Sequence, residues 1–137
     1  MKQRVLILCT ANSARSQIAE GLLRHLANDL FDVYSAGTKP SVVNPFAIRA
    51  MQARNIDISG HQSEHLDQYL TQTFDYVITV CDNAAETCPV FPGKAQRIHW
   101  SFPDPAAVAG DDDTILQSFI TVRDDLESTL SEWLNTL

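Results

Sequence analysis

Long apolar runs are absent from this chain of 137 residues, and so are internal repeats, low-complexity tracts and linker-like segments. No stretch approaches the roughly 20 apolar residues that a membrane-spanning helix needs. The first residues lead almost directly into an apolar segment, without the basic and apolar regions of a secretion signal. We therefore expect one catalytic domain, residues 1–137, in the cytoplasm.

Basic residues and cysteines are also few. Ten Lys and Arg stand against 17 Asp and Glu, which gives a net charge of −7. That balance argues against nucleic acid or an anionic membrane as a partner, because both require basic surface. Three cysteines are an odd number for a chain without a secretion signal. A structural disulfide framework is therefore not expected, whereas redox or catalytic thiols are plausible.

Apolar periodicity predicts strands that alternate with helices. Strands are expected at 4–9, 31–35, 75–81 and 96–100, and helices at 16–28, 44–54, 63–70 and 112–134. This alternation predicts a three-layer α/β domain with a four-stranded parallel sheet. Two strand orders are compatible with so short a chain, and we choose 2-1-3-4. In that order the first and third strands lie about 4.8 Å apart, and Cys9 and Cys81 end side by side at the carboxyl edge, where such sheets bind ligands.

Cys9 ends the first predicted strand, and Arg15 follows after five intervening residues. Loop amides and the start of a helix at Ser16 favour a bound oxyanion, and the Arg15 guanidinium can hold two of its oxygens. The same positive field stabilises Cys9 as a thiolate, the form that attacks. The residues expected to bind the anion are Thr10, Ala11, Asn12, Ser13, Ala14 and Arg15. The alternative is a core cysteine, with Ser16 as a simple helix cap.

Three further residues are candidates for chemistry. Cys81 and Cys88 are separated by six residues, which allows a redox pair, two incidental thiols or a zinc site with His99. Asp104 precedes Pro105 in a loop, where it can serve as a general acid or form an ordinary turn.

The loop, read as Cys-x5-Arg-Ser, resembles the signature of the low-molecular-weight protein tyrosine phosphatase superfamily. The rest of the chain resembles one branch of it, the thioredoxin-coupled arsenate reductases. The matching stretches are Cys9-Thr10, Asn12-Ser13, Arg15-Ser16-Gln17, Ala19-Glu20-Gly21, Ser35-Ala36-Gly37-Thr38, Asp57-Ile58-Ser59, Val80-Cys81, Cys88-Pro89, His99-Trp100 and Asp104-Pro105-Ala106. Two positions depart from the pattern: Ala11 stands where the family usually has Gly, and Ala14 where many relatives have another cysteine.

The resemblance implies a low-molecular-weight phosphatase-like fold and reduction of arsenate to arsenite. It implies that Cys9 attacks arsenic, that Ser16 hydrogen-bonds the Cys9 thiolate, and that Asp104 protonates the departing oxygen. It further implies that Cys81 attacks the Cys9 sulfur and that Cys88 then attacks Cys81, which leaves an exposed disulfide for thioredoxin to reduce.

The resemblance also carries expectations about ligands. No tightly bound cofactor and no catalytic metal is expected, phosphate or sulfate should bind as analogues of arsenate, and the protein should be a monomer. Some relatives bind potassium near the loop, and the approximately matching positions are Asn12, Glu20, Ser35 and Glu64.

Two other functions remain open. A phosphotyrosine phosphatase would use the same loop and Asp104 without Cys81 or Cys88, although Ala106-Ala107 replaces the tyrosines that flank an aromatic substrate in such relatives. A non-catalytic oxyanion or thiol sensor would bind the anion without forming a product. Glutaredoxin is an alternative to thioredoxin as the reductant.

Overall fold

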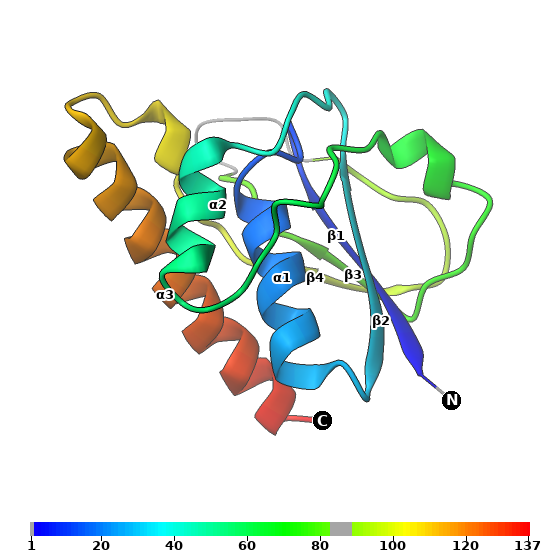
Figure 1. The fold of residues 1–137 in the computed structure, drawn as a ribbon. Coiled ribbons are helices and arrows are strands. Elements are labelled where there is room, and N and C mark those ends of the chain that lie inside the picture. The colour runs from blue at the N-terminus through cyan, green and yellow to red at the C-terminus, as the bar shows by residue number, and fades with distance from the viewer. Residues whose placement is uncertain (1, 83–88) are drawn as a thin grey trace.

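The computed structural model describes residues 2–82 and 89–137, and its strands form one parallel sheet (Figure 1). The strands are β1 (Gln3–Cys9), β2 (Phe31–Gly37), β3 (Tyr76–Thr79) and β4 (Gln96–His99). Their order is β2-β1-β3-β4, and every pairing is parallel. This confirms the predicted 2-1-3-4 sheet and places the end of β1 beside the ends of β2 and β3.

Both faces of β1 are buried, which explains its nearly continuous apolar sequence. Val5, Ile7 and Cys9 belong to one buried cluster, and Leu6 and Leu8 belong to another. The alternation follows from the period of two along a strand. The Cys9 side chain therefore faces the same layer as Val5 and Ile7.

The α-helices cover that layer. They are α1 (Arg15–Ala27), α2 (Pro45–Gln52) and α3 (Asp112–Asn135). Figure 1 shows the three packed together on one face of the sheet. The predicted apolar stripe of α3 is buried at Phe119, Val122, Leu126 and Leu130. None of the helices in the described ranges is long and apolar enough to cross a membrane.

The opposite face is covered by loops and by the 3-10 helix η1 (Leu66–Tyr69). Its buried cluster includes Leu66, Tyr69, Phe74 and Phe91. The predicted helix at 63–70 is therefore wrong in its type and length, because only one 3-10 turn forms there. A second 3-10 helix, η2 (Pro105–Ala107), follows β4.

Candidate anion-binding and thiol site

The loop at residues 10–15 joins β1 to α1, and its carbonyl groups are held from outside. The segment 39–44, which follows β2, runs along it and donates backbone hydrogen bonds: Lys39 N to Thr10 O at 3.0 Å, Ser41 N to Ala11 O at 3.3 Å, and Asn44 N to Ser13 O at 2.8 Å. The remaining carbonyl, Asn12 O, accepts from Ser63 Oγ at 2.6 Å. Four successive loop carbonyls are thus directed toward flanking groups.

This arrangement determines the direction of the loop amides. In a planar trans peptide the N–H points opposite to the C=O of the preceding residue. The amides of residues 11–14 therefore point away from the groups that hold the carbonyls, toward the concave side of the loop. The N-terminus of α1 has no side-chain cap hydrogen bond, so its dipole adds to the same field. An oxyanion is the ligand that this field favours.

Backbone conformation in the loop agrees with its sequence. Asn12 has a φ of 50°, in the left-handed region that asparagine tolerates better than most residues. Ala11 is not among the described residues with positive φ, so alanine is compatible with the position where glycine is usual in the family.

Cys9 is buried at the floor of the loop, with its thiol free. Its Sγ atom is hydrogen-bonded to Ser16 Oγ at 2.8 Å. Ser16 Oγ also accepts from Asn12 Nδ2 at 2.7 Å. Because the bond from Asn12 uses a lone pair of the hydroxyl and not its proton, Ser16 can donate that proton to a Cys9 thiolate and stabilise it. Ser16 is the second residue of α1 and does not cap it, so of its two expected roles the structure shows the contact with Cys9.

A chain of hydrogen bonds extends from this pair to a buried carboxylate. Asn12 Nδ2 also donates to Ser35 Oγ at 3.0 Å, and Ser35 Oγ donates to Glu20 Oε1 at 2.5 Å. Asn12, Ser16 and Ser35 are all at least 97 % buried, because their exposed fractions are 0 %, 0 % and 3 %. The amide of Asn12 therefore couples the end of β2 to the start of α1.

Arg15 and Asp104 lie on the other side of the loop. Arg15 is 4 % exposed, and its Nη1 atom donates to Phe102 O at 3.0 Å. Asp104 follows Phe102 by two residues and is half-buried, and its carboxylate accepts from Ala106 N at 3.0 Å. Arg15 thus tethers the segment that carries Asp104 to the anion loop.

Cys81 follows the end of β3, and Val80 N donates to Leu8 O at 3.0 Å, which continues the pairing with β1. Cys81 shares a buried cluster with Cys9. Cys81 is disulfide-bonded and 0 % exposed. At this central strand end, the Cys81 half of its disulfide is covered. Cys88 lies outside the described residues.

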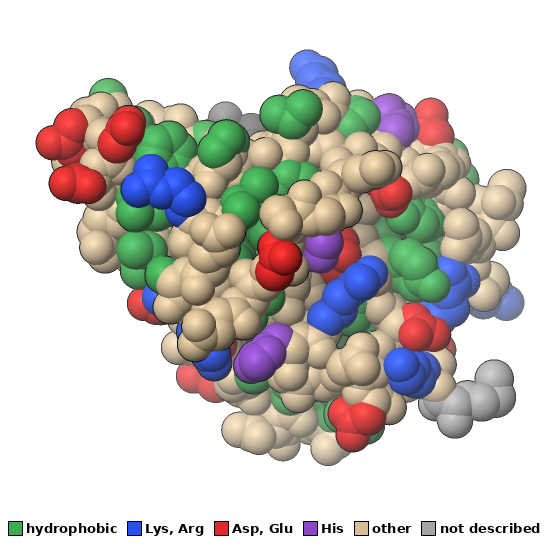
Figure 2. Space-filling view, in the orientation of Figure 1, with side chains coloured by type: hydrophobic (Ala, Val, Ile, Leu, Met, Phe, Trp, Pro, Cys, Tyr) green, Lys and Arg blue, Asp and Glu red, His purple; other side chains and the backbone are tan. Residues whose placement is uncertain are grey.

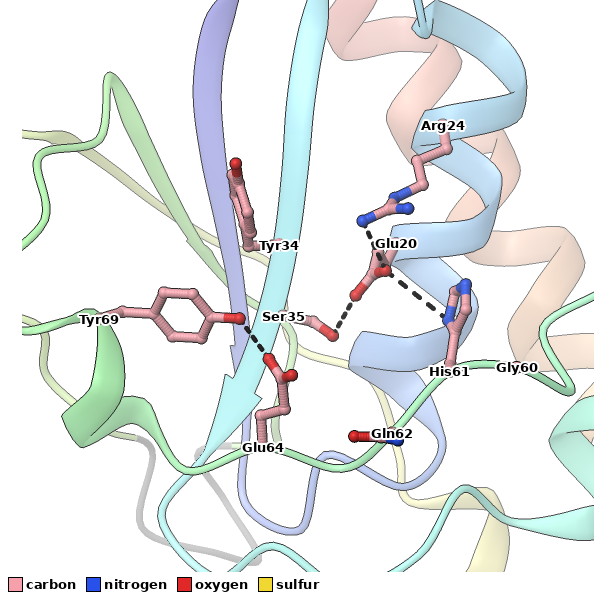
Figure 3. Close-up of a pocket in the computed structure, with 9 residues that line it drawn as sticks. All are labelled: Glu20, Arg24, Tyr34, Ser35, Gly60, His61, Gln62, Glu64 and Tyr69. Atoms are coloured by element: carbon pink, nitrogen blue, oxygen red, sulfur yellow. Dashed lines mark hydrogen bonds and ion pairs between the residues drawn. The ribbon is translucent and has the colours of Figure 1, made fainter.

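A polar pocket of about 350 Å³ lies beyond Ser35, and Figure 3 shows the side chains that line it. The Glu20 carboxylate has two basic neighbours there, Arg24 Nη2 at 3.1 Å and His61 Nδ1 at 3.7 Å. His61 Nδ1 is also 2.9 Å from Gln17 Oε1. Gln17 Nε2 in turn donates to Asn12 O at 3.1 Å and Asn12 Oδ1 at 3.0 Å.

The pocket is lined by three of the four residues considered for potassium, Glu20, Ser35 and Glu64, and the fourth, Asn12, is hydrogen-bonded to Ser35. Side-chain oxygen atoms of all four have partners in the protein. Glu64 accepts a hydrogen bond from the Tyr69 hydroxyl. Burial, followed by the hydrogen bond and charge of Glu64, raises the pKa of Tyr69 above its ordinary value, so this donor keeps its proton. Asn12 Oδ1 accepts from Glu64 N at 2.9 Å. These partners would compete with a potassium ion for the same oxygen atoms.

Three parts of this site were not recognised from the sequence. They are the segment 39–44, the buried amide of Gln17 and the hydroxyl of Ser63. Gln17 belongs to the stretch Arg15-Ser16-Gln17 that resembles the family, but no role was assigned to it. The sequence pattern gives no sign that segment 39–44 or Ser63 contacts the loop. Within residues 2–82 and 89–137, no three or more His, Cys, Asp and Glu side chains cluster to hold a metal ion.

Comparison with known proteins gives consistent results. Residues 4–137 match the family described as low molecular weight phosphotyrosine protein phosphatase. The arsenate reductase of Halalkalibacterium halodurans is 42 % identical over 135 residues, which cover 98 % of this chain and 97 % of that protein.

Solved structures agree with the sequence relatives. An arsenate reductase in a phosphate-binding state superposes with a TM-score of 0.79 and 29 % identity, over 99 % of this chain and 98 % of that one. A thioredoxin-dependent arsenate reductase of Corynebacterium glutamicum gives a TM-score of 0.69 and 26 % identity, over 99 % of this chain and 64 % of that one. Sequence and fold together show that the chain belongs to the low molecular weight phosphotyrosine protein phosphatase family, in which it is similar to arsenate reductases.

Proposed function

We propose that this protein is an arsenate reductase, active as one catalytic domain over residues 1–137 in the cytoplasm, where it serves arsenic detoxification. The observation that carries the proposal is a free Cys9 thiol beneath an amide-lined loop, in the same buried cluster as a disulfide-bonded Cys81. A phosphatase requires the first thiol only. The similarity to arsenate reductases supports the same reaction.

The first step forms a covalent adduct. Arsenate lies in the loop at residues 10–15 with its oxygen atoms held by backbone amides and by Arg15. The Cys9 thiolate, to which Ser16 donates a hydrogen bond, attacks arsenic. One arsenate oxygen leaves as water after Asp104 supplies a proton.

The second step is the reduction. The Cys81 thiolate attacks the Cys9 sulfur, and the electron pair of the sulfur–arsenic bond stays on arsenic, which leaves as arsenite. Cys88 then attacks Cys81, which releases the Cys9 thiolate and moves the disulfide to Cys81 and Cys88. The reductant that we propose is thioredoxin, whose two thiols become a disulfide. The thioredoxin-dependent relative from Corynebacterium glutamicum supports this choice over glutaredoxin.

The order of the thiols can be tested with Cys88→Ser. This variant should release about one arsenite per chain and then stop with Cys9 bonded to Cys81, because no thiol remains to free Cys9. The protein is first reduced and freed of reductant, then treated with arsenate, and mass mapping of its tryptic peptides identifies the disulfide that forms. Wild-type protein should show Cys81 bonded to Cys88, and Cys81→Ser should show neither bond.

Sustained turnover by Cys88→Ser with thioredoxin as the only reductant would contradict the relay. A phosphatase is the second candidate, since the family includes such enzymes and the loop accepts any tetrahedral oxyanion. Full aryl phosphate hydrolysis by wild type and Cys81→Ser, without arsenate reduction in the wild type, would favour the phosphatase.

A further inference from the structure

Exposed apolar side chains gather where the anion loop meets its two flanking segments. Val42 is 73 % exposed and Val108 is 38 % exposed, although both are aliphatic. Smaller apolar residues around them are exposed too. We call this surface the apolar rim and define it by Pro40, Val42, Pro45, Ala106, Ala107 and Val108.

The two halves of the rim are joined through the core. The Val42 half is bonded to the loop through Ser41 N and Ala11 O at 3.3 Å. At the base of the rim, the rings of Phe46 and Phe119 lie 5.7 Å apart. Beside Phe119, Ser118 Oγ donates to Pro105 O at 3.1 Å, which holds η2 against α3. Both halves of the rim are therefore anchored on neighbouring residues of α3, Ser118 and Phe119.

The rim carries almost no charge, in contrast to the chain as a whole. Residues 38–47 and 101–110 contain one cation, Lys39, and one anion, Asp104, whereas the whole chain has a net charge of −7. A second cation, Arg49, lies at the base of the rim with its guanidinium 5.5 Å from the centre of the Phe46 ring. The acidic run 111–113 begins just beyond the rim. Figure 2 shows hydrophobic side chains along the upper edge of the molecule, with acidic side chains at its upper left corner. A group of exposed apolar side chains with few charges is a candidate for contact with another protein.

Neither small substrate explains the rim. Arsenate is a compact tetrahedral anion that needs amides and a guanidinium and gains nothing from aliphatic side chains. An aryl phosphate would require aromatic walls, and the rim consists of Pro, Val and Ala. The protein that reduces the Cys81 disulfide, in contrast, must press its own surface against the region around the site, because Cys81 is 0 % exposed.

We propose that the apolar rim is the docking surface for the dithiol protein, of the thioredoxin class, that regenerates the enzyme; this inference rests on the proposed function. The docked partner's thiolate attacks a sulfur of the relay disulfide and forms a mixed disulfide. The partner's second thiol then breaks that bond, so two electrons pass to this chain and the partner leaves as a disulfide. The partner would recognise the rim mainly through apolar contacts, and the exposed side chains of Val42 and Val108 would make the main ones.

The test compares two reductants. Val42→Asp and Val108→Asp place a charge in the rim, and each should raise the KM for thioredoxin by about fivefold or more, as expected where a contact residue is lost. The rate with saturating dithiothreitol and the KM for arsenate should stay within about twofold of wild type, because dithiothreitol needs no docking surface. Leu30→Asp is the matched control, since Leu30 is 52 % exposed and precedes β2 at the amino edge of the sheet.

Three other outcomes would contradict either the docking surface or the proposed function. An unchanged KM for thioredoxin in both valine variants would overturn the docking surface while leaving the reductase intact. A raised KM for an aryl phosphate, with thioredoxin kinetics unchanged, would assign the rim to a phosphatase substrate and would also overturn it. A wild-type protein that reduces no arsenate with either reductant would instead refute the proposed function. Val42→Ser and Val108→Ser repeat the test, and the dithiothreitol rate reports whether each variant is folded.

Discussion

Individual residues determine how closely the end of β2 approaches the anion loop. Asn12 places its amide between Ser16 and Ser35, and Gly37 passes beside the Thr10 carbonyl. A Cβ atom at Gly37 would lie 2.3 Å from Thr10 O, a backbone atom that cannot move without moving the loop. Only glycine at position 37 therefore allows β2 to lie this close to the anion loop.

Gly37→Ala should therefore damage both stability and activity. The steric overlap must displace the loop or β2, and we expect a loss of about 1–3 kcal/mol in the free energy of unfolding, the range for forced overpacking. Urea unfolding monitored by tryptophan fluorescence measures the stability, and arsenate turnover measures the effect on the loop.

Gly60→Ala is the control for the same substitution. A Cβ atom at Gly60 would meet nothing within 4 Å, so this variant should stay within about 1 kcal/mol of wild type and should retain its turnover. Equal stability for the two variants would show that the contact between Gly37 and the loop is unimportant.

At the scale of elements, the long helix α3 holds the rim and the core together, and its first turn depends on one cap. Asp111 accepts a hydrogen bond from Thr114 N at 2.8 Å. The hydrogen bonds with Thr114 lower the pKa of Asp111 below its ordinary value. A carboxyl group with a lowered pKa in the folded state stabilises the protein above its unfolded pKa, and this contribution is lost as the pH falls through the folded value.

The Asp111→Asn variant tests this predicted dependence of stability on pH. Asparagine can cap the helix but does not titrate, so wild type should be more stable than the variant near pH 6 and should lose this advantage on acidification below about pH 4. Thermal unfolding followed by circular dichroism at several pH values gives the difference. Asp112→Asn removes a charge from the same turn without removing the cap and should show a weaker dependence on pH. An advantage of wild type that grows toward low pH would contradict the assignment.

At the scale of the whole molecule, four segments meet in the pocket of Figure 3, and the carboxylates there have partners within the protein. Glu20 lies on α1 with Arg24, His61 comes from the segment before η1, and Tyr69 from η1 donates to Glu64. The carboxylates of the pocket therefore already have neighbours that neutralise or bind them.

We expect arsenate turnover to be insensitive to potassium. Replacing potassium chloride with choline chloride at constant ionic strength should change kcat/KM by less than about twofold, because the pocket carboxylates are already paired. Removing the pairing in Arg24→Gln should lower activity and make it respond to potassium. His25→Gln, which changes an exposed residue on the same helix, should behave as wild type. A strong dependence of the wild type on potassium would show that the ion displaces these pairs.

Much of the fold could be predicted because local patterns encode it. The apolar run before Cys9 predicted the central strand, and alternation with helices predicted the parallel sheet. The order 2-1-3-4, chosen from two, correctly placed Cys9 and Cys81 at neighbouring strand ends. Ends of elements were less predictable. The third strand was expected at 75–81 and covers Tyr76–Thr79, since strand ends depend on ladder hydrogen bonds with neighbours.

The sequence by itself determined which residues alternate into the core, where the thiol stands relative to Arg15, and which family the pattern resembles, because these properties depend on periodicity and short spacing. Only the tertiary structure decided that segment 39–44 holds the loop carbonyls, that Ser63 bonds Asn12, and that Glu64 pairs with Tyr69. Such bonds form where folding brings together groups that are distant in the chain, and each group must find a partner once it is buried. The identity of that partner depends on three-dimensional packing, which no local pattern records.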